Sequence, residues 1–261
     1  MPAGDAIYET LRRLLTALTE SELTEELHRA TRLLGFEQFA MGHHVDLLHP
    51  PDSVVRITNY DPEWIERALT ESFFADDPVH LASTRTATGF LWSDIASHID
   101  PTARQLAILE IARSYGLHEG YTVPVHVPGE YRGTCSFGAR SLTRLGRDAL
   151  PAANLIGIYA FEAARQIRRS RISPGRRALV PKLTDRQHDT LVLIGRGKAD
   201  REIASVLGIS SATAHEHVEN VRRAYGYAQR PNLVARALFD GQISFADVLA
   251  ANLPLWSTFG G

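Results

Sequence analysis

The sequence predicts an α+β protein, in which an N-terminal α-β-α sandwich with a central antiparallel sheet is followed by a C-terminal four-helix domain. The chain has 261 residues, more than the ~100–150 of a usual single domain, so two domains are expected. Helix-like and strand-like apolar periodicities alternate up to about residue 168, whereas only the helical period follows residue 183. Between these two regions, residues 165–182 hold seven basic residues and no acidic one.

The N-terminal elements follow the order helix, helix, strand, strand, helix, helix, strand, strand, helix. Apolar residues spaced three and four apart predict helices over 7–18, over 102–115 and over 152–168. The same spacing predicts a further helix that begins after Thr24 and runs to Leu34. Helices also begin at Asp61-Pro62 and Asp77-Pro78, because proline fits the first turn. Alternation predicts strands in 36–48 and 53–58, and a hairpin of 120–128 with 133–140. Pairs of helices between pairs of strands predict the sandwich.

The chain is expected to have four segments: an N-terminal domain over 1–168, a linker over 169–182, a C-terminal domain over 183–243 and a C-terminal extension over 244–261. Like charges beside Pro174, Gly175 and Pro181 repel one another and resist compaction, which indicates a linker. Residues 1–164 carry 13 arginines and no lysine against 22 acidic residues, so the net charge of −2 hides a basic strip after an acidic domain. The strip is either a solvated connector or a surface that lies near phosphates.

The C-terminal domain shows four helical segments, over 184–196, 199–207, 211–226 and 230–240. In the middle pair, Ile203, Ala204 and Leu207 face inward. Gly208 permits a left-handed turn, and Ser210 stands at the next N-cap. This pattern is typical of a helix-turn-helix, whose second helix enters the DNA major groove, although an ordinary helical hairpin is the alternative. The candidate DNA contacts are Lys198, Ser211, Thr213, His215, Glu216, Glu219, Arg222, Arg223 and Arg230, with the arginines expected on phosphates.

Residues 183–243 resemble the GerE/LuxR-type DNA-binding domain along their whole length. The match is carried by LTDRQHDTLVLIGRGKADREIASVLGIS, and by His217 and Asn220 in the second helix. The sequence departs from the family pattern at Gln187, where Glu is usual, at Ala214, where Val is usual, and at Ala224-Tyr225, where Lys-Leu is usual. The resemblance implies that this domain binds double-stranded DNA.

The N-terminal segment, over roughly residues 5–170, resembles the autoinducer-binding domain of quorum-sensing LuxR-type regulators. The match is carried by YDPEWIERALTESFFADDPV, GFLWSD and YGLHEGYTVPVHVPG. The resemblance implies that Trp64 donates its indole N–H to a lactone carbonyl and that Asp77 accepts the ligand amide N–H. It further implies that Tyr60 and Ser136 complete the polar set around the acyl carbonyl, while Trp92 packs near the head group. An uncharged acyl amide needs such a few convergent polar groups in an apolar pocket.

One departure within this match concerns the acyl chain. Ala68, one helical turn after Trp64, stands where the family usually has Tyr. The missing ring predicts room for a branched or aromatic acyl group. Taken one at a time, the matched residues have ordinary structural interpretations: a tryptophan in a core, an Asp-Pro helix start at Asp77 and a turn at Gly120.

Both resemblances together imply a quorum-sensing transcriptional regulator, not an enzyme. We expect it to bind an N-acyl-homoserine lactone or a close mimic and, as a homodimer, an inverted-repeat DNA site, with RNA polymerase as a further partner. A two-component response regulator is an alternative, although its receiver would begin with alternating strands and helices rather than two helices. A regulator that needs no ligand is another alternative, and an enzyme acting on acyl lactones is a third that would need a nucleophile or a metal.

Composition and cysteine content exclude other classes. With 44% hydrophobic and 22% charged residues the chain is typical of globular proteins rather than disordered ones. It has no apolar stretch of ~18 residues and no signal-peptide pattern, so we expect a cytoplasmic protein without membrane contact. The single cysteine, Cys135, excludes a disulfide framework and has no nucleophile signature around it. His43 and His44 point to opposite faces of a strand, so with His49 they do not predict a metal site, and no cofactor is expected.

The C-terminal extension has an amphipathic pattern of its own. Ser244 with Asp247 predicts a helix N-cap and a short helix over 245–252. The apolar residues that fall on one face are Phe245, Val248, Leu249 and Leu253. Burial of each large apolar group is worth ~1.5–3 kcal/mol, so we expect the tail to dock, across a dimer or against the N-terminal domain. A frayed terminus with few contacts is the alternative.

Overall fold

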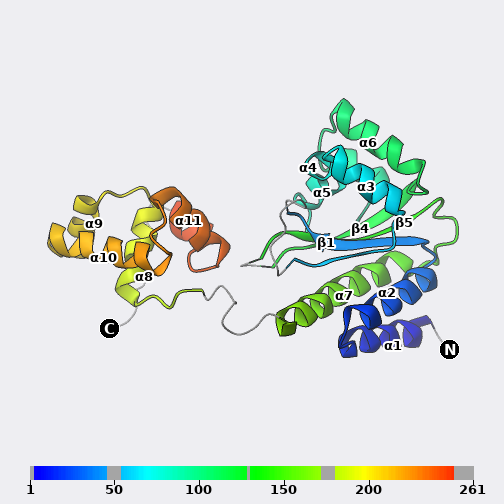
Figure 1. Ribbon diagram of the computed structural model, residues 1–261, viewed down its shortest axis with the longest axis horizontal. Coiled ribbons are helices and arrows are strands. Elements are labelled where there is room, and N and C mark those ends of the chain that lie inside the picture. The colour runs from blue at the N-terminus through cyan, green and yellow to red at the C-terminus, as the bar shows by residue number, and fades with distance from the viewer. Residues whose placement is uncertain (1–2, 46–53, 128–129, 172–179, 250–261) are drawn as a thin grey trace. The chain divides into compact units, whose positions relative to one another are not determined.

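The computed structural model describes residues 3–45, 54–127, 130–171 and 180–249 (Figure 1). These residues fall into two compact units, one built from residues 3–45, 54–126 and 131–171 and the other from residues 127, 130 and 180–249. No helix within these ranges is both long enough and apolar enough to span a membrane.

The first unit contains eight helices and five strands, counted over its described residues. They are α1 (Ala3–Thr16), α2 (Glu20–Leu34), β1 (Gln38–His43), β2 (Arg56–Thr58), α3 (Pro62–Thr70), α4 (Phe73–Asp76), α5 (Pro78–Ser83), β3 (Phe90–Leu91), the 3₁₀ helix η1 (Trp92–Ser97), α6 (Ala103–Arg113), β4 (Glu119–Val125), β5 (Gly133–Ala139) and α7 (Ala149–Arg171). The strands form one antiparallel sheet in the order β2-β1-β5-β4-β3. Helices α1, α2 and α7 lie on one side of the sheet and α3 to α6 on the other, as Figure 1 shows, so the predicted sandwich is confirmed.

The two faces of the sheet have different surroundings. Successive strand residues point to opposite faces, so a pair such as Phe39 and Phe137, which stand opposite each other on β1 and β5, lies on one face together. Both rings are fully buried in the core formed with α2 and α7. The neighbouring pair, Ala40 and Ser136, lies on the opposite face, toward the layer of α3 to α6. This second face forms the floor of the site described below.

Helix starts agree with the sequence where a cap was recognisable. Asp61 accepts a hydrogen bond from the Glu63 N–H at 2.8 Å, and Asp77 accepts one from the Val79 N–H at 2.8 Å, each with a proline in the first turn. The second helix begins at Glu20 rather than after Thr24, because Thr19 caps it and the polar first turn carries no apolar period.

Three short elements were not predicted, and one predicted helix is longer than expected. Helix α4 has four residues, β3 has two and η1 has six, which is too short for an apolar period to appear. Helix α7 extends on both sides of the predicted 152–168. Residues 46–53, in which the first predicted strand ends, and most of the predicted linker lie outside the described residues.

The second unit has the four predicted helices, α8 (Asp185–Gly195), α9 (Asp200–Leu207), α10 (Ser211–Ala224) and α11 (Arg230–Phe239). They pack around a core that includes Leu191, Ile203, Val218 and Leu233. Gly208 has φ 66° between α9 and α10, and the hydroxyl of Ser210 accepts a hydrogen bond from the Thr213 N–H at 3.1 Å. A left-handed turn followed by a capped second helix forms the predicted helix-turn-helix.

The described part of the C-terminal extension is a fifth helix, α12 (Phe245–Leu249), with the expected Ser244 cap on Asp247. Val248 packs into the core of the second unit, and Arg196 of that unit donates a hydrogen bond to the Asp247 carbonyl at 2.7 Å. Phe245 and Leu249 are exposed in the described part of the chain, and the expected docking of the tail across a dimer or against the N-terminal domain stays a prediction. One apolar side chain per turn is what so short a helix can bury on a single neighbour. The rest of the tail lies outside the described residues.

Candidate ligand pocket and DNA-contacting surface

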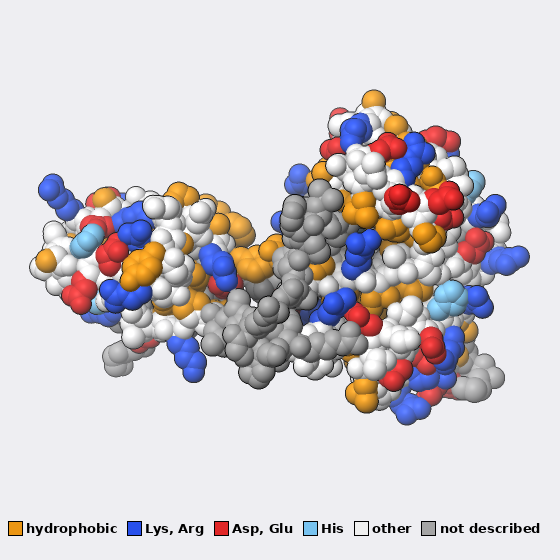
Figure 2. Space-filling view, viewed as in Figure 1, with side chains coloured by type: hydrophobic (Ala, Val, Ile, Leu, Met, Phe, Trp, Pro, Cys, Tyr) orange, Lys and Arg blue, Asp and Glu red, His pale blue; other side chains and the backbone are white. Residues whose placement is uncertain are grey.

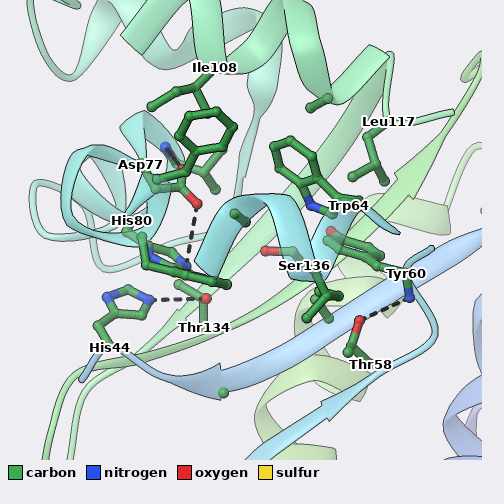
Figure 3. Close-up of a pocket in the computed structure, with 18 of the residues that line it drawn as sticks. His44, Thr58, Tyr60, Trp64, Asp77, His80, Ile108, Leu117, Thr134 and Ser136 are labelled. Carbon is green, nitrogen blue, oxygen red and sulfur yellow. Dashed lines mark hydrogen bonds and ion pairs between the residues drawn. The ribbon is translucent and has the colours of Figure 1, made fainter. Parts of the chain in front are cut away.

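A cavity of about 570 Å³ lies between the sheet and the layer of α3 to α6 (Figure 3). Most side chains around it are apolar, and its size falls within the range of small-molecule sites. All six residues predicted to bind a ligand line it: Tyr60, Trp64, Ala68, Asp77, Trp92 and Ser136. They come from the β2–α3 loop, α3, the cap of α5, η1 and β5, so the fold brings together residues that are far apart in the chain.

Trp64 offers a hydrogen-bond donor to this cavity. Its ring is 9% exposed and packs against Phe73 and Tyr115, with ring centroids 5.9 Å and 5.6 Å away. Among the residues that the structure describes, its indole Nε1 has no hydrogen-bond partner, and Figure 3 shows this nitrogen on the side of the ring toward Tyr60 and Ser136. A buried donor needs a partner, and a carbonyl in the cavity would supply one.

Trp92, in contrast, already uses its indole N–H. It donates to the Thr122 hydroxyl at 2.9 Å, and this hydroxyl lies 2.8 Å from the hydroxyl of Ser136. The Trp92 ring lies over Gly120, where a Cβ would come within 2.5 Å of it. Trp92 is therefore a wall of the cavity that also orients Ser136 through Thr122, a residue that sequence reasoning missed.

The two carboxylate oxygens of Asp77 have different partners. Oδ1 accepts the Val79 N–H and caps α5, while Oδ2 lies 3.6 Å from Nε2 of His80 on the next turn. The side chain is 25% exposed and lines the cavity. One oxygen therefore holds the helix and the other is available to a donor in the cavity.

Among the polar cavity residues that were not found from the sequence are His44, His80 and Thr134. His44 Nε2 lies 3.2 Å from the Thr134 hydroxyl, and the His44 ring stacks on that of His80 with centroids 3.8 Å apart. Burial, together with electrostatic interactions with the neighbouring histidines and Arg132, lowers the pKa of His44 to about 2, so this imidazole is neutral. The signal that could have found it was the alternation of β1, which places His44 on the same face as Ala40 and Gly42.

The neighbouring histidine and the single cysteine lie on the other face of the sheet. His43 accepts the Val55 N–H at 3.0 Å and packs edge-on against Phe161, as the alternation predicts. Cys135 is fully buried against α7, and burial raises the pKa of its thiol well above the usual range. The described residues contain no group of three side chains that could hold a metal ion, and His49 lies outside them.

Tyr60 precedes α3 and contributes its ring and hydroxyl to the cavity. Its backbone N–H donates to the Thr58 hydroxyl at 3.0 Å, which fixes the residue between β2 and α3. Burial raises the pKa of the Tyr60 phenol well above its usual range, so the group is a neutral donor and acceptor. Ala68 is 2% exposed and leaves the cavity open one turn after Trp64.

The predicted DNA contacts lie on and around α10, and most are held by neighbouring side chains. Lys198 pairs with Glu202 at 3.0 Å, and the hydroxyl of Thr213 lies 2.9 Å from that of Ser210. Ser211 and Glu216 are exposed, with no side-chain partner within the described ranges. Acidic and basic side chains are mixed over the visible face of the second unit in Figure 2, which agrees with local pairing.

Asp200, which sequence reasoning missed, connects two of the predicted contacts. Its carboxylate lies 2.8 Å from His215 Nδ1 on α10 and pairs with Arg230 at the start of α11. Arg230 also donates to the Lys198 carbonyl at 2.8 Å. These contacts join the α8–α9 turn and the start of α9 to α10 and to α11.

The three predicted phosphate contacts differ in their partners. Arg222 pairs with Glu219 at 2.5 Å and Arg230 pairs with Asp200, so both charges are balanced within the protein. Within the described ranges, the side-chain partners of Arg223 are neutral: the Asn220 side-chain oxygen at 3.0 Å and the Tyr227 hydroxyl at 3.2 Å. Of the three, Arg223 keeps an unbalanced positive charge on the exposed helix.

A cavity of ligand size in one unit and a helix-turn-helix in the other define a transcriptional regulator with a ligand-binding domain. Family models agree with this class: residues 19–164 match the autoinducer binding domain, and residues 181–237 match bacterial regulatory proteins of the luxR family. The chain belongs to the LuxR family and is a quorum-sensing transcriptional regulator, not an enzyme. The antiparallel sheet also differs from the alternating parallel topology that a receiver domain would show.

Individual relatives cover more than two thirds of the chain. The transcriptional activator protein AhyR of Aeromonas hydrophila is 25% identical over 96% of this chain and 97% of its own. The quorum sensing-dependent regulator RpaR of Rhodopseudomonas palustris is 30% identical over 69% of this chain and 72% of its own. The crystal structure of Escherichia coli SdiA has the same fold, with a TM-score of 0.64 at 22% identity over 92% of this chain and 98% of its own.

Proposed function

We propose that the protein binds an N-acyl-homoserine lactone, or a close mimic, in the cavity of its first unit. The observation that carries this proposal is that the six residues expected to bind the signal line one cavity, with the unpaired indole N–H of Trp64 among them. Trp64 would donate to the lactone carbonyl, Asp77 would accept the amide N–H, and Tyr60 with Ser136 would bind the acyl carbonyl. A mimic is included because a related fold, SdiA, has been solved in complex with octanoyl-rac-glycerol.

Ligand binding would act through the stability of the first unit. A cavity of about 570 Å³ in a folded core lacks the packing contacts that a ligand restores. A ligand at 100 times its Kd adds about 2.7 kcal/mol to the free energy of unfolding, since it binds the folded state only. Folding and signalling would thus share one free energy, and more folded protein would be available to DNA.

On DNA, residues 183–243 would act as a homodimer on an inverted repeat, because two-fold symmetric readers match two half-sites. Leu155, Ile158 and Tyr159 are exposed at helical spacing on α7, and such apolar faces mark contacts with other chains. Analytical ultracentrifugation with and without ligand measures the assembly.

The experiment that tests the signal class is a thermal-shift panel of acyl-homoserine lactones on the full chain, with straight, branched and aromatic acyl groups. We expect at least one lactone to raise the unfolding temperature in a concentration-dependent manner. Homoserine lactone without an acyl group is the control and should have little effect. A flat response to every acylated compound would contradict the proposal.

Ala68→Tyr is expected to change the choice of acyl group. The buried tyrosine ring would fill part of the cavity, so branched and aromatic lactones should lose affinity relative to straight-chain ones, by about tenfold or more. Calorimetric titration of the three ligand types into both proteins measures the ratio. If the order of preference among them is the same in the variant, Ala68 does not line the acyl part of the site.

Arg223→Ala is expected to weaken DNA binding by a similar factor on every sequence and to lower the slope of log K against log salt by about one unit. The reason is the unbalanced charge of Arg223, which neutralises one phosphate. Arg222→Ala is the matched comparison, and its slope should change less because Glu219 already pairs with that arginine. Titrations of labelled operator at several salt concentrations give both slopes, and a loss confined to one base pair would contradict the phosphate role.

A further inference from the structure

The floor of the cavity carries two successive rows of residues across the sheet. In the first row, Ala40 on β1 stands between Thr58 on β2 and Ser136 on β5. Two residues further along β1, Gly42 stands between Arg56 and Thr134. Both rows line the cavity, and they are separated by the ~7 Å that two residues span along a strand.

The first row belongs to the set that would bind the lactone and the amide, through Ser136. The second row contains none of those six residues, yet it is polar on both sides of Gly42. His44 extends it, because His44 Nε2 lies 3.2 Å from the Thr134 hydroxyl, and the His80 ring stacks on that of His44. Figure 3 shows His44, His80 and Thr134 grouped on one side of the cavity, with Trp64 and Tyr60 on the other.

The second group carries the permanent positive charge of Arg56. Arg56 is exposed at the edge strand and lines the cavity, and it forms no ion pair within the described part of the chain. Asp77 is the one acidic residue among the described cavity residues, and its free oxygen lies 3.6 Å from His80. His44 is neutral for the reason given above and acts there only as a hydrogen-bonding group. Arg56, which is permanently charged, and Thr134, which carries a hydroxyl, therefore line the part of the cavity beyond the amide site.

We propose that the acyl group of the signal ends in an oxygen acceptor, a carboxylate, which Arg56 and Thr134 bind at this second row. The inference rests on the proposed function and specifies its ligand. Arg offers a planar fork of donors that matches a carboxylate, and the Thr134 hydroxyl adds a further donor beside it. An alkyl chain of the same length would place its methyl end against the guanidinium and gain neither contact.

The test compares two lactones with acyl chains of six carbons, N-hexanoyl- and N-(5-carboxypentanoyl)-homoserine lactone. We expect the carboxylate to bind the full chain at least tenfold more tightly by calorimetric titration. Arg56→Met keeps an unbranched side chain and removes the charge, so it should abolish this preference while the affinity for the hexanoyl lactone is unchanged or higher. Arg85→Met, at an exposed arginine that does not line the cavity, is the matched control and should keep the preference.

A charge exchange separates recognition from structure. Arg56→Glu should reject the carboxylate and bind N-(6-aminohexanoyl)-homoserine lactone more tightly than the native protein does, which a merely structural arginine would not produce. Thermal unfolding of each variant without ligand checks that it is folded. The inference is overturned if the native protein prefers the hexanoyl lactone or binds both equally, while the proposed function still stands. It falls together with the proposed function if neither these lactones nor any other in the panel binds.

Discussion

Asp77→Asn is expected to lower ligand affinity by about 10- to 100-fold. This is the largest effect that we predict from the loss of one hydrogen bond. A hydrogen bond to a charged group contributes ~1.5–3 kcal/mol, and tenfold in affinity corresponds to ~1.4 kcal/mol. Asparagine has one oxygen where aspartate has two, and Oδ1 of Asp77 already caps α5 through the Val79 N–H. The amide nitrogen that replaces Oδ2 would meet the N–H of the ligand as donor against donor.

This substitution is informative because the fold should tolerate it. Asparagine caps helices about as well as aspartate, so the unfolding temperature without ligand should hardly change. Asp77→Ala is the matched control, since it removes the cap and the ligand contact together and should lower both stability and affinity. Trp64→Phe keeps an aromatic ring beside Phe73 and removes only the indole N–H, so we expect a loss of about 2- to 10-fold. Calorimetry measures all three, and unchanged affinity in both Asp77→Asn and Trp64→Phe would remove the pocket assignment.

Gly120→Ala is expected to destabilise the first unit by about 1–3 kcal/mol or more and to abolish the response to ligand. A Cβ at this position would lie 2.5 Å and 2.6 Å from two carbons of Trp92 and 2.7 Å from the Phe137 carbonyl oxygen. The backbone of β5 cannot move without breaking the sheet, so the Trp92 ring must shift. It would then lose its bond to Thr122, and the orientation of Ser136 would be lost as well.

Urea unfolding with and without ligand measures both consequences. Gly146→Ala is the control, since a Cβ there meets nothing within 4 Å and the glycine is exposed. That variant should match the native midpoint and its increase with ligand. A Gly120→Ala protein with native stability and a native ligand response would show that Trp92 can be displaced without cost, against the role given to it here.

Local chemistry explains which parts of the fold were predictable. Asp61-Pro62 and Gly208 specify a helix start and a turn through their own backbone preferences, so those elements were found. Helix α4 and strand β3 are too short to show a period, and they exist because neighbouring elements hold them. In the tail, the apolar pattern of Phe245 and Leu249 predicted docking, and among the described residues of the tail it is Val248 that packs on a neighbouring core.

The residues of the candidate site also fall into a group that could be predicted from the sequence and a group that could not. The six expected residues were found through resemblance, and the structure places all of them around one cavity. His44, His80 and Thr134 meet only because of the pairing of β1 with β5 and the position of α5, which no single stretch of sequence specifies. Thr122 was missed for the same reason, since its role depends on contacts with Trp92 and Ser136 across the sheet.

The arrangement of side chains on strand β5 determines how such a receptor can evolve to recognise a different ligand. All seven of its residues are buried, with Cys135 and Phe137 in the core beneath the sheet, and Thr134 and Ser136 on the cavity floor. Substitutions at 134 and 136 can therefore alter ligand preference while the packing against α7 stays the same. A slip of one residue in the pairing with β1 and β4 would instead exchange the two sets of side chains. The hydrogen bonds on both edges of β5 thus fix which of its residues face the core and which face the cavity. Evolution can therefore change the residues that contact the ligand without changing the residues that stabilise the core.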